Sequence, residues 1–456
     1  MSNNMELMEK DSKKAIMKIA IPLLVLNLIT TLYNVVDGIW VSGVSTPAIV
    51  AVGAIIPSFS VLIGVSNGIG VGATSAIGYY IGTKDRKKVI LAIKNAIFVF
   101  FNFTVIMTVL FIFILEPLLV SFNLGEEAIR EGLSYGIPLF ACSFTFVFSA
   151  GIFGIYRACG ETKKPLYALG LGFILNALLD PVFIYVLHLG VAGAAISSVL
   201  TSLLGVIILG YWLLVKKTIY PDYSDYKFKL DTGIIKRILN VGLPASFEVF
   251  LISTAASVLI YFTQLAGGDN GVAVHTLGYR IYQVALIPIS SFCGALVIAV
   301  SNALGAKNVT IIKEVFKFTC ILTVITGFIS MLIISVFAED ISLIYSFSKE
   351  TAVLIPSITV FLQIVTLSLP FLGLGLPSTF VFQGLSKGMY SFIWTLIREA
   401  ILLLFFTYFF GFLMDWGLFG VWIGFVIGKS SSSVFNYLHA NYYINNTVTE
   451  KLSKDD

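Results

Sequence analysis

Residues 192–215 read AGAAISSVLTSLLGVIILGYWLLV, with no Asp, Glu, Lys or Arg among them. A helix needs roughly 20 apolar residues to cross the hydrocarbon core of a bilayer, which is about 30 Å thick. The stretch is followed at once by Lys216 and Lys217, whose charges favour the aqueous side of such a helix. We therefore predict a transmembrane helix at this position.

Similar apolar stretches lie on both sides of this one along the whole chain. The 456 residues are 57% apolar and 12% charged, with a mean hydropathy of +0.94, which leaves too little polar surface for a soluble globule. We predict an all-α integral membrane protein of twelve transmembrane helices. Their expected spans are residues 16–41, 49–80, 89–115, 133–156, 166–188, 192–215, 240–266, 272–303, 316–338, 353–382, 390–413 and 418–442.

Basic residues gather in every second connection of this arrangement, whereas the other connections carry mainly Asp and Glu. The basic positions are the N-terminal segment, residues 84–88, 157–164, 216–237 and 307–317, Lys387 and the C-terminal tail. Cytoplasmic loops of membrane proteins retain Lys and Arg. We therefore predict a multi-pass protein of the cell membrane with both termini in the cytoplasm.

The sequence offers no constellation suited to catalysis or to a resident metal. Its four cysteines and three histidines lie singly within or beside apolar segments, without the spacing of metal ligands or of a nucleophile and its base. We predict that the protein is not an enzyme and has no cofactor. We also expect no nucleic-acid partner and a monomeric state.

The two halves of the chain repeat one another in their punctuating residues. Ile21-Pro22 recurs as Leu243-Pro244, and the sequence IGTKD at 81–85 recurs as LGAKN at 304–308, with offsets of 222 and 223 residues. Two further pairs follow in the same order with offsets of 224 and 227. Four ordered matches with slowly drifting offsets predict an internal duplication.

Each repeat holds six helices, so both copies cross the membrane in the same direction. We predict a pseudo-two-fold axis along the membrane normal and a cavity between two lobes. The N-terminal lobe is expected at 1–215 and the C-terminal lobe at 240–456. The basic segment 216–239 between them is expected to be the cytoplasmic linker.

Ionisable residues inside transmembrane segments are costly and need a partner, water or a neutral state. Tyr33, Asn34 and Asp37 lie at spacings of three and four residues, which places them on one face of the first helix. The alternative is that Asp37 caps or ends this helix, because Gly38 follows it.

The fifth helix carries Asn176 and Asp180 one turn apart, followed by Pro181. Because proline has no N–H, the carbonyl of Ala177 loses its helical donor. A carboxylate, an amide and a free carbonyl therefore converge. The alternative is that Asp180 is a helix-terminal acid before a proline.

If these two helices are neighbours, their oxygens suit a proton shared between Asp37 and Asp180 or a small hard cation such as sodium. Ser198 in the sixth helix could add a ligand. No other metal is expected.

The second half does not repeat these acids, and its own polar residues are ambiguous. Glu248 could bind a cation or cationic substrate, or lie near the cytoplasmic interface within reach of water. Arg280 shares a face with Thr276 and Gln283 and could contact substrate, although structural pairing with a carboxylate is favoured. Arg398 and Glu399 lie about 15 Å from the cytoplasmic start of the eleventh helix, so the longer side chain, Arg398, is expected to reach part of the way toward the interface, and Lys429 to do likewise from the twelfth.

Several of these motifs resemble those of the multidrug and toxic compound extrusion (MATE) transporters. They are Tyr33-Asn34-Val35-Val36-Asp37, Gly160-Glu161-Thr162-Lys163, Asn176-Ala177-Leu178-Leu179-Asp180-Pro181 and Leu304-Gly305-Ala306-Lys307-Asn308. Their order, the chain length and the six-plus-six arrangement strengthen the resemblance.

This resemblance implies an antiporter that expels organic, often cationic, compounds while sodium ions or protons run inward and two lobes rock about a central cavity. By position, Asp37, Asn176 and Asp180 would form the cation site of the N-terminal lobe, with Tyr33 beside it. Ser198 stands where the family often has threonine, and Glu248 matches an acid found in some branches only.

Three other functions are weighed against it. A flippase for lipid-linked saccharide precursors should have a cavity rich in Arg and Lys, whereas the candidate cavity charges here are mostly acidic. A channel should show a repeated filter segment, and a membrane-embedded enzyme should show a catalytic constellation. The expected partners are small organic cations or drugs and membrane lipids.

Overall fold

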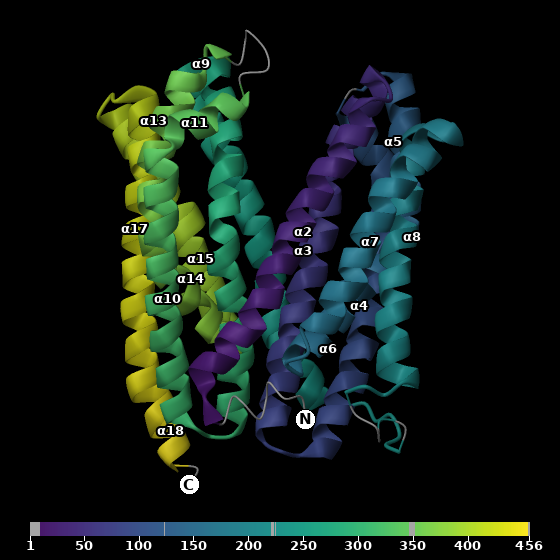
Figure 1. The fold of residues 1–456 in the computed structure, drawn as a ribbon, viewed down its shortest axis with the longest axis vertical. Coiled ribbons are helices and arrows are strands. Elements are labelled where there is room, and N and C mark those ends of the chain that lie inside the picture. The colour runs from purple at the N-terminus through teal and green to yellow at the C-terminus, as the bar shows by residue number, and fades with distance from the viewer. Residues whose placement is uncertain (1–9, 123, 220–222, 224, 346–351, 455–456) are drawn as a thin grey trace. The chain divides into compact units, whose positions relative to one another are not determined.

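The computed structural model describes residues 10–122, 124–219, 223, 225–345 and 352–454, which are helical over most of their length (Figure 1). The first half contains α2 (Ser12–Ser42), α3 (Thr46–Gly82), α4 (Arg86–Ser121), α5 (Glu126–Ala141), α6 (Ser143–Ala158), α7 (Lys163–Pro181), η1 (Val182–Val186), α8 (Gly190–Gly210) and η2 (Tyr211–Val215). The second half contains α9 (Thr232–Gly305), α10 (Val309–Val336), α11 (Ala338–Ser342), η3 (Leu343–Tyr345), α13 (Ile355–Val365), η4 (Thr366–Ser368), α14 (Leu369–Gly384), α15 (Gly388–Leu396), η5 (Ile397–Leu402), α16 (Leu403–Tyr408), η6 (Phe409–Leu413), α17 (Gly417–Tyr443), η7 (Ile444–Val448) and α18 (Thr449–Lys454).

The predicted fold class is confirmed. Among the described residues, ten helices are long and apolar enough to cross a membrane, and the pair α5 and α6, bent by 44°, makes an eleventh. Helix α9 consists of two helices that meet at a kink at Gly268, where φ is +59°. Glycine adopts this left-handed backbone without a steric penalty. The kink lies between the predicted spans 240–266 and 272–303, so the total is twelve.

The chain divides into two compact units, and two helices contribute to both of them. Among the described residues, one unit comprises Lys10 and Ile21–Ser246, and the other comprises Asp11–Ala20 and the residues from Phe247 onward. Helix α2 therefore passes from the second unit to the first just before Pro22. Helix α9 passes from the first unit to the second just after Pro244.

Polar contacts attach the start of α2 to the second unit and the described part of the basic segment 216–239 to the first. At the start of α2, Ser12 donates a hydrogen bond to Glu314 on α10 (3.2 Å), and Lys13 lies 3.3 Å from the same carboxylate. In the first unit, Asn95 on α4 donates to the carbonyl of Lys229 (3.0 Å) and accepts from the N–H of Asp231 (3.0 Å). The described part of the basic segment 216–239 is thereby held against α4.

Each unit has one helix pair that packs through a glycine and a threonine. In the first unit α3 packs on α6, and the Thr74 hydroxyl donates to the carbonyl of Gly154 (3.0 Å). In the second unit α10 packs on α14, beside α17 (Figure 1), and the Thr323 hydroxyl donates to the carbonyl of Gly373 (2.6 Å). Small residues allow the close backbone approach that transmembrane helices use for packing.

Candidate functional site

Polar side chains from four elements of the first unit meet inside its apolar helices. Helix α2 supplies Tyr33 and Asp37, and α7 supplies Asn176 and Asp180. We call them, with three further residues, the carboxyl cluster. Its members are Tyr33, Asp37, Tyr135, Asn176, Asp180, Ser197 and Ser198. Asp180 is fully buried and Asn176 is 1% exposed, so water does not solvate these groups.

Hydrogen bonds hold one oxygen of Asp180 in place. The Asn176 amide donates to Oδ1 of Asp180 (3.1 Å) from one helical turn earlier, and it lies 3.3 Å from the Ser197 hydroxyl. Ser197 on α8 also donates to this oxygen. Donors on one side of the carboxyl group fix its orientation and leave its second oxygen free.

The two acids of the carboxyl cluster lie within range of each other's charge. The carboxyl groups of Asp37 and Asp180 are close enough to interact through their charges. Oδ1 of Asp37 and Oδ2 of Asp180 are buried and have no hydrogen-bond partner in the described part of the chain. Two nearby carboxylates with open oxygens favour binding of a positive charge, because like charges in a poorly solvated site repel each other.

The two alternatives in which these acids merely end helices are wrong. Helix α2 continues to Ser42, five residues beyond Asp37. After Pro181, α7 passes directly into the π-helical turn η1, so Asp180 lies inside the apolar segment. The side chain of Asn34 lies outside the described residues.

The serine that contacts Asp180 is Ser197, not Ser198, which the sequence analysis named as the candidate ligand. Ser197 contacts Asp180, whereas Ser198 accepts a hydrogen bond from the Tyr33 hydroxyl at 2.8 Å. Tyr33 and Ser198 therefore contact each other, and among the described residues no hydrogen bond joins the Ser198 hydroxyl to Asp37 or Asp180. Tyr135 on α5, 8% exposed, interacts electrostatically with Asp37 and Asp180 and was not predicted.

Glu248 on α9 is buried in the second unit with two polar partners. The Ser391 hydroxyl on α15 donates to its Oε1 (2.6 Å), and the Gln383 amide on α14 lies 3.4 Å from its Oε2. The carboxyl group is only 8% exposed. Of the two alternatives left open for Glu248, the one in which water reaches it at the cytoplasmic interface is therefore wrong.

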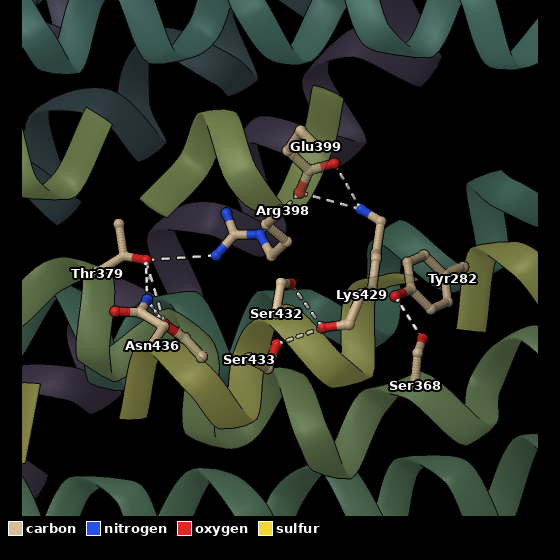
Figure 2. A network of polar contacts seen from close by, with 10 residues as sticks. Tyr282, Ser368, Thr379, Arg398, Glu399, Lys429, Ser432, Ser433 and Asn436 are labelled. Atoms are coloured by element: carbon tan, nitrogen blue, oxygen red, sulfur yellow. Dashed lines mark hydrogen bonds and ion pairs between the residues drawn. The ribbon is translucent and has the colours of Figure 1, made fainter. Parts of the chain in front are cut away.

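A second set of charges, which we call the ion-pair cluster, consists of Arg398, Glu399 and Lys429. Nζ of Lys429 lies 2.9 Å from Oε2 and 3.1 Å from Oε1 of Glu399, and Nε of Arg398 lies 2.9 Å from Oε1. Figure 2 shows the Lys429 ammonium directed at both carboxylate oxygens, while the Arg398 guanidinium also reaches Thr379 at 3.3 Å. Two cations thus share one carboxylate.

The prediction that Arg398 and Lys429 reach toward the membrane interface is wrong. Arg398, Glu399 and Lys429 are 4%, 7% and 5% exposed. The first two are neighbours in the π-helical turn η5, where the wider turn allows both side chains to point into the bundle. Such turns are frequent at functional sites.

A cavity of about 180 Å³ in the second unit adjoins the ion-pair cluster. Its walls are Ala256, Leu259, Ile260, His275, Thr276, Tyr279, Arg280, Glu399, Leu403, Phe425 and Lys429. Arg280 forms no hydrogen bond or ion pair with the described residues, so the favoured pairing with a carboxylate is not found among them. Gln283 is exposed and does not line the cavity.

Twelve apolar helices in two similar halves among the described residues, each half with a buried charged cluster, are typical of membrane proteins of the transporter class. A family model described as MatE matches this chain twice, over residues 22–182 and 244–409. The chain belongs to the MatE family. The double match also supports the internal repeat read from the sequence.

Known proteins similar to this chain agree with that membership. It is 25% identical over 344 residues to the "Probable multidrug resistance protein YoeA" of Bacillus subtilis (strain 168), with 73% of each chain covered. It is 24% identical over 394 residues to the "Multidrug export protein MepA" of Staphylococcus saprophyticus, with 86% of this chain and 85% of that one covered. A solved structure described as the outward-facing conformation of a multidrug resistance MATE family transporter has a TM-score of 0.94 and 31% identity, with 99% of each chain covered. MATE proteins are transporters, so the prediction that this chain is not an enzyme is confirmed.

Proposed function

We propose that the protein is a cation-coupled antiporter that exports organic compounds, cationic or amphipathic, across the cell membrane by alternating access. The coupling ion is a proton or a sodium ion bound in the carboxyl cluster. The relatives named above are a multidrug resistance protein and a multidrug export protein, which supports small organic molecules as cargo.

The observation that carries this proposal is the pair of open carboxylate oxygens. Asp37 Oδ1 and Asp180 Oδ2 lack hydrogen-bond partners among the described residues, while Asn176 and Ser197 hold the other side of Asp180. A proton would remove one of the two negative charges. A sodium ion would instead take carboxylate oxygens as ligands, and hard cations prefer oxygen.

Coupling follows if the ion and the cargo favour different conformations. An ion that stabilises one arrangement of α2 lowers the affinity for a compound that binds the other arrangement, and linkage makes the effect reciprocal. Asp37 lies on α2, and this helix contributes residues to both units. Occupancy of the carboxyl cluster could therefore influence both.

Efflux of a fluorescent cationic dye from proteoliposomes tests the proposal. An inward sodium gradient and an inward proton gradient are imposed separately on the wild type, Asp37→Asn and Asp180→Asn, with Glu116→Gln as an exposed acid control. We expect one gradient to drive efflux in the wild type and the control only. Full gradient-driven efflux in both Asn variants would exclude the carboxyl cluster as the coupling site.

The same assay separates the flippase alternative. Absence of efflux under both gradients with several dyes would favour transport of lipid-linked precursors instead.

The proposal also includes the orientation of the protein, with both termini in the cytoplasm, a monomeric state and contact with membrane lipids. Protease accessibility of tags at each end of the chain in sealed vesicles tests the orientation.

A further inference from the structure

The cavity beside the ion-pair cluster has the size of a small ring system. Its volume is about 180 Å³, whereas an apolar cavity of about 150 Å³ holds benzene. Tyr279 and Phe425 line it, and the His275 ring stacks on Tyr279 with centroids 5.6 Å apart and planes at 10°. A planar aromatic group would find parallel faces here.

The charges around this cavity are positive in excess, so the expectation from the sequence that the cavity charges are mostly acidic does not hold for it. Glu399 lines it, but Lys429 contacts both of its oxygens and Arg398 contacts one, so two cations balance this one carboxylate. Arg280, an exposed residue, adds a third cation at the cavity wall and has no ionic partner among the described residues. A ligand that brought a negative charge would complete this set, whereas a cation would meet repulsion.

The imidazole of His275 adds a buried polar group to the wall of this cavity. His275 is 5% exposed, and its Nδ1 has no hydrogen-bond partner in the described part of the chain. Buried polar groups of native proteins are rarely left without one. In the tautomer that carries its proton on Nδ1, His275 could donate this hydrogen bond to the carboxylate of a ligand.

From this geometry we propose that the second unit binds a planar aromatic molecule through a carboxylate or similar anionic group. The aromatic ring lies against Tyr279 and His275, and Arg280 holds the anionic group with its two parallel N–H donors. The ion-pair cluster provides the remaining positive field. If the proposed export function holds, the cargo then includes aromatic acids and zwitterions in addition to cations.

Equilibrium dialysis of the purified protein in nanodiscs tests the proposal without any gradient. The probes are 2-naphthoate and its neutral analogue 2-naphthamide, with empty nanodiscs as the blank for partition into lipid. We expect the wild type to bind naphthoate about tenfold to a hundredfold more tightly than naphthamide, as one charge-assisted hydrogen-bonded pair allows. Equal affinities for the two probes would overturn the proposal.

Substitutions locate the site. Arg280→Gln should reduce the preference for naphthoate to about threefold or less, whereas Arg130→Gln, an exposed arginine on α5, should leave it unchanged. His275→Phe retains the ring stack and should weaken naphthoate without weakening naphthamide. An unchanged preference in Arg280→Gln, or displacement of naphthoate by inorganic phosphate as effectively as by benzoate, would contradict the assignment.

Failure of this inference and failure of the export proposal can be told apart. Loss of ion-driven dye efflux with retained naphthoate preference would refute only the coupling mechanism. Efflux that works in a protein without any preference for naphthoate would refute only the anionic site.

Discussion

The two units bury polar clusters of opposite character in helices that correspond within the repeat. In the first unit, Asp37 and Asp180 interact as two acids, and neither forms an ion pair among the described residues. In the second unit, Glu399 is shared by Arg398 and Lys429. One half is therefore short of positive charge and the other has an excess of it. Duplication kept the architecture while the chemistry of the two halves diverged.

The largest effect should come from removing the shared carboxylate of the ion-pair cluster. Glu399→Gln leaves two buried cations facing each other, and breaking a buried ion pair costs about 3–5 kcal/mol. We expect a marked decrease in the melting temperature in detergent micelles. Asp180→Asn removes a carboxylate that pairs with no cation among the described residues, so its melting temperature should be close to that of the wild type. Similar melting of both variants would contradict the comparison.

A combined replacement provides the control for that prediction. Changing Arg398 to Met, Glu399 to Leu and Lys429 to Met together removes all three charges. Replacing buried ionic groups by apolar residues of similar volume is often neutral or stabilising. We expect melting to recover while binding of 2-naphthoate weakens.

Ion-dependent stabilisation should arise only from the carboxyl cluster. At a hundredfold excess over its Kd, the coupling ion should stabilise the folded protein by about 2.7 kcal/mol. Thermal shifts measured against sodium concentration and against pH should show this increment in the wild type. Asp37→Asn and Asp180→Asn should lose it, whereas Lys429→Met should retain it from a lower starting point. Loss of this increment in Lys429→Met would place the ion in the second unit and contradict the prediction.

The two serines on α8 test the geometry at a finer scale. Ser197 donates to Asp180, so Ser197→Ala should change the affinity for the coupling ion about tenfold, as expected for a hydrogen bond to a charged group. Ser198→Ala breaks only the contact with Tyr33 and should change ion affinity by about twofold at most. Titration of the ion-dependent thermal shift measures both, and the reverse order would favour Ser198 as the ligand.

Much of the fold could be predicted because lipid imposes a length and a polarity on every span. The predicted break between 266 and 272 coincides with the kink at Gly268 for the same reason: apolar character decreases there and glycine permits the bend. Asp37 and Asp180 were predicted as a pair because acids in apolar helices are rare.

The remaining features depend on helix phase and on contacts between distant segments. Ser197 and Ser198 differ by one position on a helix, and the sequence does not show which of them faces α7. Glu399 and Lys429 are 30 residues apart, so only the packing of η5 against α17 shows that they meet. The π-helical turn that turns Arg398 and Glu399 inward has no signature in the sequence.

The smallest effects should come from the threonine contacts that join helices within each unit. Thr323→Val removes one hydroxyl that donates to the Gly373 carbonyl, and such interhelical bonds contribute about 0.6 kcal/mol in a membrane. Thr74 has a second role, because it accepts from Nε and NH2 of Arg157 at 3.1 and 3.0 Å. Thr74→Val should therefore cost about 1 kcal/mol more than Thr323→Val, because a charged donor group loses its acceptor. Thr74→Ser, which retains the acceptor, should recover most of that difference in thermal unfolding, and equal losses in both Val variants would show that the Arg157 contact contributes nothing to the first unit.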